Sequence, residues 1–529
     1  MANTSNLHWS NINKGTRVSI MIALSLGMLM ACLDGTVMST AIRAILEDFG
    51  GYDLYSWVFT GFMLCETIMI PLAGKLSDQY GRKPIFMFGL IVFLAGSILS
   101  GLSQNMEQLI AFRAIQGIGG GTLIPVATAT VADLYAPSER GKMQGMLGAL
   151  FAVAMALGPF VGGFITDNIS WHWVFFVNVP IGVLAIIFAL KKFPTPDIQD
   201  KVKVDYFGMA ALSAFILVLL LFFTWVGVKF DWVSLDSLLM IAVAAVLLAI
   251  FIKLEFKHSE PVLKPSLFKN KMFIYCCITM FVMGVAMMGV MTYMPVFMQS
   301  VMGISATNSG VILLPLVAGM MITSMISGFT VKRTGYRPWL MVGPIIAAAG
   351  MILLSTLGIG PGQDADQMHA VAYLFIVGAG LGCLMSTIMI AAQNASKLGE
   401  MGMTTSSVNL FRSIGSTVAV GVFTTIINGK IASELIEKLP SNIYDILPDH
   451  STGVMNYIGI PPFDAFAELI KQAYGNSVTF AFLIGSVVVL IVLITGFFMK
   501  GKPSDAEELQ LPDSLIEDAA VAAEIAESE

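Results

Sequence analysis

Residues 74–84 read Gly-Lys-Leu-Ser-Asp-Gln-Tyr-Gly-Arg-Lys-Pro, and an apolar run long enough to cross a lipid bilayer lies on each side of them. The two glycines allow the tight backbone geometry of a turn. Four charged side chains would be costly in hydrocarbon, so the turn must lie in water at a membrane surface. They are Lys75, Asp78, Arg82 and Lys83. The stretch therefore predicts a protein with several membrane-spanning helices.

The composition of the whole chain favours the same class of protein. The 529 residues are 56% hydrophobic and 12% charged, which leaves too little polar surface to cover a soluble domain. Apolar runs of about 20 residues, the length that crosses a bilayer, recur along the chain. We count fourteen: 17–41, 54–74, 84–103, 106–132, 142–166, 171–190, 205–226, 235–256, 272–298, 305–330, 338–358, 368–393, 401–428 and 477–499. An even count places both termini on one side of the membrane.

The distribution of basic residues predicts which side that is. When the termini and the even-numbered connections are cytoplasmic, most of the 29 Lys and Arg residues fall on the cytoplasmic side, as the positive-inside rule requires. The exceptions in external loops are Arg43, Lys229, Lys430, Lys438 and Lys471. We therefore expect a multi-pass protein of the cell membrane with both termini in the cytoplasm.

No residue pattern indicates a metal, a cofactor or a nucleic acid. The five cysteines lie in apolar runs without metal-site spacing, and the five histidines lie in loops or at the ends of runs. The usual ligands and acid–base groups of an intramembrane metalloenzyme are thus missing. Residues 1–16 form a polar cytoplasmic N-terminus, and residues 503–529 form an acidic cytoplasmic tail expected to be solvated and largely disordered.

Two glycine-rich motifs follow the turn. They read Arg113-Ala-Ile-Gln116-Gly117-Ile-Gly119-Gly-Gly121 and Gly158-Pro159-Phe-Val-Gly162-Gly163. With the 74–84 turn, they resemble the signature motifs of the major facilitator superfamily. Leu33–Val37, Trp171–Pro180 and Leu267-Phe268 further resemble segments of its fourteen-span drug:proton antiporters, which include quaternary-ammonium and multidrug exporters. The resemblance covers about residues 17–500.

An internal repeat supports the fold that this resemblance implies. Residues 328–338 repeat the 74–84 turn, and Gly378, Gly380 and Gly382 repeat the spacing of Gly117, Gly119 and Gly121. We expect an all-α membrane protein with the major facilitator fold: two six-helix halves, 17–190 and 272–499, and an inserted helix pair, 205–256. Asp78 aligns with Lys332, so the second turn lacks the acid.

Four ionisable residues lie within the predicted spans, where such groups are functional candidates by default. Counting from the span ends at 1.5 Å per residue places Asp34 and Arg113 both ~10 Å below the outer surface, so the two can pair. Glu66 lies ~18 Å deep, slightly past the midplane. A neighbouring cation favours a charged Asp34 and burial favours a protonated Glu66, which makes the two carboxylates a candidate proton relay. The alternative for Glu66 is a structural hydrogen bond.

The fourth ionisable residue is Arg412. Spans 9–11 contain no acid that could pair with it, so we expect its partner to be a carbonyl, or Asn409 and Gln393. We assign Arg412 no firm role. The resemblance implies that the 74–84 turn acts as a gate. The residues that match the gate and helix motifs are Gly74, Asp78, Gly81, Arg82, Lys83, Gln116, Gly117, Gly158, Pro159, Gly162 and Gly163. Pro159 removes one backbone hydrogen bond, and Gly162 and Gly163 permit close helix approach.

Two further regions leave alternatives open. Residues 429–475 form the longest external loop, with helix-like periodicity at 431–439 and 463–470, and act either as a lid or as a spacer packed on the second half. Span 9 is rich in methionine, which suits a pocket that accepts several shapes but also ordinary packing. Its residues are Met283, Met287, Met288, Met291, Met294 and Phe297.

The function that follows from the resemblance is proton-coupled antiport. The chain is expected to be a monomer that exports lipophilic, often cationic, drugs or toxic compounds by alternating access, with protons, a small-molecule substrate and the bilayer as its partners. The alternative is export of a specific metabolite, amino acid, siderophore or lipid on the same scaffold. The missing buried histidines disfavour an intramembrane enzyme, and the intact turn disfavours a non-transporting sensor.

Overall fold

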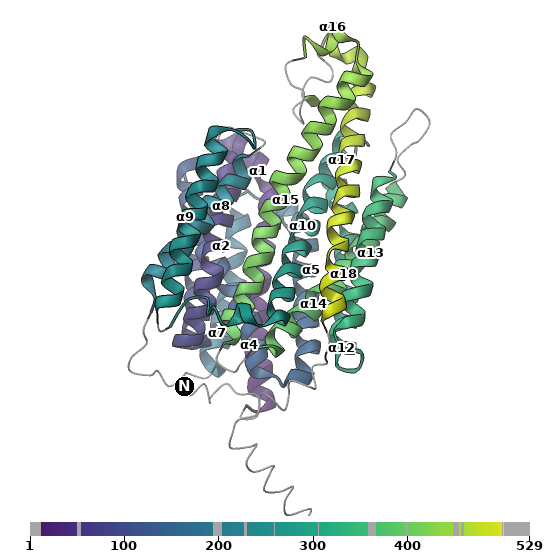
Figure 1. The fold of residues 1–529 in the computed structure, drawn as a ribbon. Coiled ribbons are helices and arrows are strands. Elements are labelled where there is room, and N and C mark those ends of the chain that lie inside the picture. Colours follow the sequence, from purple (N-terminus) through teal and green to yellow (C-terminus); the bar gives the residue numbers. More distant parts are fainter. Residues whose placement is uncertain are drawn as a thin grey trace, which may run out of the picture.

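The computed structural model describes residues 12–49, 54–193, 204–226, 230–258, 260–304, 306–357, 367–396, 400–447, 454–455, 460–499 and 501. These residues fold into a bundle of long, roughly parallel helices (Figure 1). The acidic tail 503–529 and most of the predicted polar N-terminus lie outside the described residues.

The first half of the bundle consists of α1 (Lys14–Phe49), α2 (Tyr55–Tyr80), α3 (Arg82–Gly101), α4 (Met106–Leu134), α5 (Pro137–Asn168), α6 (Trp173–Phe176) and α7 (Asn178–Lys192). The predicted span 171–190 is therefore interrupted at Val177. Gly81 separates α2 from α3 with a φ of 91°, a conformation that side chains other than glycine rarely adopt.

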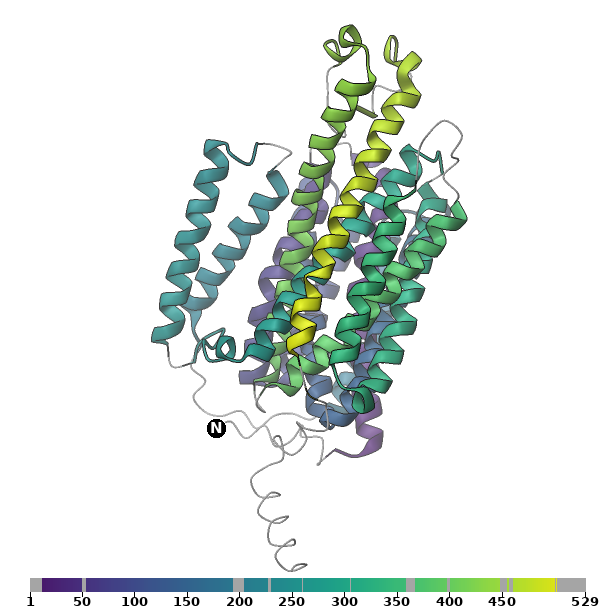
Figure 2. The same ribbon diagram turned by 45° about the vertical axis from the view of Figure 1, so that its right-hand side comes forward.

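The second half consists of η1 (Leu267–Lys269), α10 (Lys271–Ser300), α11 (Ala306–Ile312), α12 (Leu314–Thr334), α13 (Arg337–Ser355), α14 (Gln367–Asn394), α15 (Met401–Lys438), α16 (Ser441–Tyr444), η3 (Phe463–Phe466), α17 (Ala467–Leu490) and α18 (Val492–Phe498). Between the halves come α8 (Tyr206–Trp225) and α9 (Leu235–Lys257), which stand beside the bundle in Figure 2. Of this pair, α8 contacts α2 and α15.

Thirteen helices of the described residues are long and apolar enough to cross a membrane. The predicted count of fourteen spans is therefore not confirmed. The remaining predicted span, 142–166, lies within α5, a helix of 32 residues that packs against α1 and α12.

Glycines bring the helices of each half close together in the same pattern. On α4, Gly117 and Gly121 lie against the α2 backbone, while Gly119 lies against α3. On α14, Gly378 and Gly382 lie against α12, while Gly380 lies against Ala347 of α13. The sequence repeat is thus a repeat of helix contacts, because each set of three glycines joins one central helix to two neighbours.

The external loop predicted over residues 429–475 is shorter in the structure, because helices extend into it from both ends. The helix predicted to end at 428 continues as α15 to Lys438, and α17 begins at Ala467 rather than at 477. The two helices project beyond the rest of the bundle in Figure 1. No proline interrupts α15 before Pro440, so the periodic segment 431–439 extends the spanning helix instead of forming a separate one.

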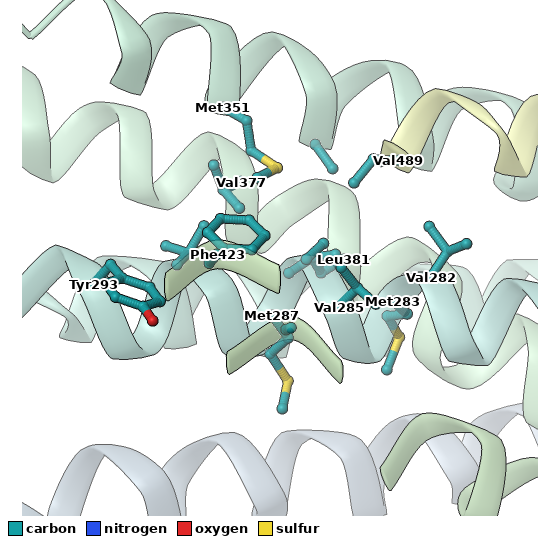
Figure 3. Packing of buried hydrophobic residues seen from close by; sticks show 14 of the residues in the cluster. Val282, Met283, Val285, Met287, Tyr293, Met351, Val377, Leu381, Phe423 and Val489 are labelled. Carbon is teal, nitrogen blue, oxygen red and sulfur yellow. The ribbon is translucent and has the colours of Figure 1, made fainter. Parts of the chain in front are cut away.

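The core of the second half settles the role of most methionines of α10. Met283, Met287 and Met294 are buried in a hydrophobic cluster, together with Phe297, and Met288 and Met291 pack against it. Figure 3 shows Met283 and Met287 with Phe423 and Leu381. These side chains serve packing between helices.

The glycine contacts generate a stability prediction. A Cβ at Gly380 would lie 2.6 Å from Cα of Ala347, so Gly380→Ala must push α14 away from α13. Overpacking of this kind costs about 1–3 kcal/mol, and we expect the apparent Tm of the detergent-purified protein to fall by several degrees. Gly429→Ala on α15 is the control, because a Cβ there has nothing within 4 Å. Equal Tm values for the two variants would contradict the close-packing argument.

Candidate functional site

Asp34 on α1 is the centre of a buried polar network in the first half. Its side chain is only 2% exposed. Arg113 of α4 forms an ion pair with Oδ2 of Asp34, while Oδ1 accepts hydrogen bonds from Nε2 of Gln116 at 2.7 Å and from Nδ2 of Asn178 at 3.0 Å. The depth calculation from the sequence placed Asp34 and Arg113 at one level, and the structure brings them together.

Neighbouring groups hold the Arg113 guanidinium in place. Its Nη1 also donates to Oε1 of Gln116 at 2.8 Å, and its plane lies 4.2 Å from the centre of the Phe62 ring. Asn178 donates to Oγ of Ser97 at 3.0 Å. A desolvated ion pair is tolerated only when its remaining hydrogen-bonding groups are largely satisfied. Adding a proton to Asp34 would therefore disturb the contacts of α1 with two other helices, α4 and α7.

Glu66 on α2 and Arg412 on α15 are not bonded to the Asp34 network. The two helices that carry them are in contact. A hydrogen bond of 2.7 Å between the hydroxyls of Thr67 and Ser413 joins α2 to α15 immediately beside them. Arg412 and Arg113 are both close enough to act electrostatically on Glu66. Within the described residues, neither side chain has a hydrogen bond or ion pair. Both side chains are partly exposed inside the bundle. Because neither has a direct partner among the described residues, their charges are not fixed by a bond.

Arg412 also lines a central cavity between the halves. The cavity has a volume of about 40 Å³, and its wall includes Met28, Ile124, Thr128, Gln144, Leu147, Phe151, Met280, Met385, Met389, Asn409 and Arg412. Gln393, considered above as a partner for Arg412, instead donates to the carbonyl oxygen of Thr128 at 2.9 Å. Asn409 donates to the Thr405 carbonyl oxygen of its own helix at 3.0 Å.

The predicted 74–84 turn is largely helical in the structure: residues 74–80 end α2, and α3 begins at Arg82 directly after Gly81. This segment, for which we keep the name 74–84 turn, lies at the basic end of the bundle, the end that carries Lys75, Arg82, Arg140 and Lys264. Asp78 Oδ1 accepts a hydrogen bond from the backbone N–H of Gly402 at 2.9 Å, and Oδ2 accepts one from that of Met403 at 2.7 Å. These N–H groups belong to the first turn of α15, where four N–H groups lack helical partners and the helix dipole favours an anion. Asp78 thus caps a helix of the opposite half.

Arg82 holds Asp78 in this position. The guanidinium pairs with Asp78 Oδ1 at 2.7 Å and with Asp133 Oδ2 at 2.7 Å, and it donates to the Ser77 hydroxyl at 2.7 Å. A Cβ at Gly74 would lie 2.6 Å from the carbonyl oxygen of Gly402, so only glycine allows this approach of α2 to α15.

Lys83 lies at the rim of the turn, where its Nζ lies 3.4 Å from the carbonyl oxygen of Leu190. It is not part of the Asp78–Arg82 network.

A second set of contacts closes the basic end between α5 and the second half. Arg140 donates to Oδ1 of Asn394 at 2.7 Å, and Gln144 donates to Oε1 of Gln393 at 3.2 Å. A Cβ at Gly141 would lie 3.2 Å from the carbonyl carbon of Gly328. The cavity is therefore sealed on this side by polar bonds and by backbone contact.

The remaining motif residues lie on α5 above this seal. Gly158 lies against Thr36, two residues from Asp34, and a Cβ at Gly158 would lie 2.6 Å from Cβ of Thr36. Pro159 follows within the helix, Gly162 is buried, and Gly163 faces open space. Gly158 thus brings α5 close to α1 beside the Asp34 network, whereas the predicted close helix approach at Gly163 is wrong, because a Cβ there would have nothing within 4 Å.

Several residues of the site were not identified from the sequence. Asn178 stood in a segment chosen for its resemblance, but no role was given to it, and Ser97, Phe62 and Asp133 carried no signal. The partners of Asp78 were also not predicted. They are backbone N–H groups, which nearly every residue carries, so no residue type in the sequence indicates them. Glu66 was not considered for Arg412, since acids were sought only in spans 9–11.

The chain is similar to known transporters over most of its length. A family model described as Major Facilitator Superfamily matches residues 24–420. The Multidrug transporter protein MdtP of Bacillus subtilis (strain 168) is 36% identical over 423 residues, which cover 80% of this chain and 77% of that protein. Multidrug resistance protein 3 of the same organism is 35% identical over 491 residues, which cover 91% of this chain and 94% of that protein.

Solved structures show the same fold at low sequence identity. The proton:xylose symporter XylE bound to 6-bromo-6-deoxy-D-glucose aligns with a TM-score of 0.61 at 14% identity, covering 94% of this chain and all of that one. The human organic anion transporter MFSD10 aligns with a TM-score of 0.60 at 15% identity, covering 91% and 99% of the two chains. From the matched family model, its relatives and the helix arrangement, this chain is a transporter rather than an enzyme and belongs to the Major Facilitator Superfamily.

Proposed function

We propose that this protein exports lipophilic drugs or toxic compounds from the cell in exchange for protons. The observation that carries the proposal is the central cavity, lined largely by methionine and other apolar side chains, bordered by Arg412 and sealed at the basic end. Flexible thioethers suit ligands of different shapes. The two Bacillus relatives named for multidrug transport and resistance support drugs as the substrate class.

The proposed transport cycle is alternating access. The contacts of Asp78 and Arg140 close the basic end, which the positive-inside rule assigns to the cytoplasm together with both chain termini. Drug-sized ligands occupy pockets of about 300–1,000 Å³, far more than the space present in this closed state. The cavity must therefore enlarge as α2 parts from α15 and α5 parts from α12.

The proposed coupling uses the carboxylates of Asp34 and Glu66. Protonation of Asp34 would cancel its attraction for Arg113 and loosen the network that joins α1, α4 and α7. Glu66 lies on the gate helix α2 and interacts with Arg412 at the cavity, so it can sense both the proton and the substrate. One proton that crosses a potential of 100 mV supplies about 2.3 kcal/mol for uphill export.

The proposed setting is the cell membrane, with the protein acting as a monomer. The alternative function, export of a specific metabolite, amino acid, siderophore or lipid, predicts a single preferred substrate. A panel of dyes and metabolites tested for substrate-induced proton release separates the two, because a multidrug exporter responds to several unrelated lipophilic compounds.

Asp34→Asn tests the buried network. The change removes a charge at nearly constant volume, and we expect proton-coupled drug export to fall at least about tenfold, because interactions with a buried charge pair are worth several kcal/mol. The measurement is drug accumulation in everted vesicles, normalised to the amount of inserted protein. Asp48→Asn, on the same helix but hydrogen-bonded to Trp171, is the matched control. Wild-type export by correctly inserted Asp34→Asn would refute the assigned role.

Asp78→Asn tests the gate. The change replaces one acceptor oxygen by an NH2 donor and removes the charge from the other hydrogen bond to α15, which weakens the closed cytoplasmic end. We expect turnover to fall at least about tenfold while equilibrium substrate affinity changes by less than about threefold. Affinity is measured by tryptophan quenching and turnover by transport into liposomes. Asp236→Asn, an exposed acid in the first turn of α9, controls for charge. A large loss of affinity with unchanged turnover would contradict a gating role.

Glu66→Gln tests proton coupling. We expect this variant to lose substrate-induced proton release and proton-driven accumulation but to retain downhill substrate exchange, since exchange needs no net protonation cycle. Liposomes at several external pH values separate the two fluxes, with the exposed Glu107→Gln as control. Normal proton-driven accumulation by Glu66→Gln would return this carboxylate to a structural role and leave Asp34 as the coupling group.

A further inference from the structure

The inserted helices α8 and α9 take no part in the cycle described above, yet the segment that follows them runs across the basic end. This return segment, residues 258–270, connects α9 to α10. Its described residues bond to Lys75 of α2 in the first half and, in the second half, to Ala395 directly after α14 and to Glu400 and Met403 at the start of α15. Like α8, which packs on α2 and α15, the return segment therefore touches both sides of the proposed gate, and it does so at the basic end.

The last turns of α9 anchor the return segment. The Glu255 carboxylate is buried and accepts hydrogen bonds from the backbone N–H groups of Val262 at 3.2 Å and Leu263 at 2.9 Å. The side chains of Val262, Leu263 and Leu267 are buried in the core of the second half. Because the backbone of Val262 and Leu263 and the three apolar side chains are held in place, the charged residues of the return segment have fixed positions.

One ion pair and one amide hydrogen bond join the return segment to the second half, and a second ion pair joins it to the first half. Lys264 pairs with Glu400 at 2.7 Å, at the start of α15, and Asn270 donates to the carbonyl oxygen of Ala395 at 3.1 Å. Although partial burial opposes the charge, the hydrogen bond to Glu400 raises the pKa of Lys264. These contacts tie the return segment to the second half.

The contact with the first half is a single ion pair inside the gate turn. Nζ of Lys75 donates to Oε2 of Glu260 at 2.9 Å, and the Lys75 side chain is only 4% exposed. The hydrogen bond from Lys75 holds the pKa of Glu260 below its ordinary value, so the Glu260 carboxylate stays charged at neutral pH. Lys75 lies on α2, three residues before Asp78, and Glu400 lies two residues before the first N–H that Asp78 binds.

We propose that the return segment of the inserted helix pair is a latch on the cytoplasmic gate, with Lys75–Glu260 as the bond that breaks when the gate opens. The proposal rests on the gating role of the 74–84 turn. The segment moves with the second half through Lys264 and Asn270, so separation of α2 from α15 pulls Lys75 away from Glu260. This gives α8 and α9 a function: they fix a second bond across the gate beside that of Asp78.

The test measures how often the closed gate opens. Thr128→Cys places a thiol at the wall of the cavity, in a full-length protein whose five native cysteines are replaced by alanine. A membrane-impermeant maleimide is added to the cytoplasmic side of everted vesicles. We expect Glu260→Gln to raise the labelling rate about three- to tenfold, because a charge-assisted bond to a buried lysine is lost. Glu468→Gln, which loses an exposed pair with Lys471, should leave the rate unchanged.

A double-mutant cycle identifies the bond. Lys75→Met and Glu260→Gln should each raise the labelling rate, and the double variant should show no further increase beyond the larger single effect. Additive effects, or an unchanged rate in Glu260→Gln, would overturn the latch.

Asp78→Asn in the same assay separates failure of the latch from failure of the gate. If Asp78→Asn accelerates labelling and Glu260→Gln does not, the gate stands and the latch is wrong. If neither accelerates labelling, the gating role of the turn is refuted and the latch is refuted with it.

Discussion

The closed state depends on one carboxylate that caps a helix of the other half. Asp78 supplies acceptors for two N–H groups at the start of α15, a place where partial positive charge is left unsatisfied. Arg82 fixes the carboxylate and also pairs with Asp133, so one guanidinium faces two carboxylates, and the N-terminus of α15 supplies further partial positive charge to Asp78. Such an arrangement is strong when assembled and leaves several polar groups unpaired when separated, which is the property that the proposed gate needs in order to have two discrete states.

The Asp34 network differs from the Asp78 contacts, because all of its bonds lie within the first half. Its members come from α1, α3, α4 and α7, and the ion pair is almost completely removed from solvent. A change of charge there alters the packing of the first half, while the gate bonds at the basic end link the two halves. Gly158 brings α5 against α1 beside Asp34, and the same helix carries Gly141 and Arg140 at the seal. A continuous helix thus connects the buried charge with the gate.

Much of this architecture could be predicted from the sequence, because spans and motifs leave local signals. Depth counting placed Asp34 opposite Arg113, and the repeated glycines indicated two related halves, in which the structure shows equivalent helix contacts. Features set by tertiary contact could not be predicted. Asn178 reaches Asp34 only because α7 packs beside α1, and Glu66 lies near Arg412 only because Thr67 meets Ser413 across the halves.

The central claim is that an inward proton gradient drives drug export through this protein. The most direct test is uptake of a fluorescent lipophilic drug into liposomes containing purified wild-type protein, with its cytoplasmic side facing outward and the lumen more acidic than the medium. The account predicts accumulation that rises with the pH gradient, stops when nigericin collapses it, and releases luminal protons as drug enters. Accumulation that is the same with and without the gradient would contradict the account.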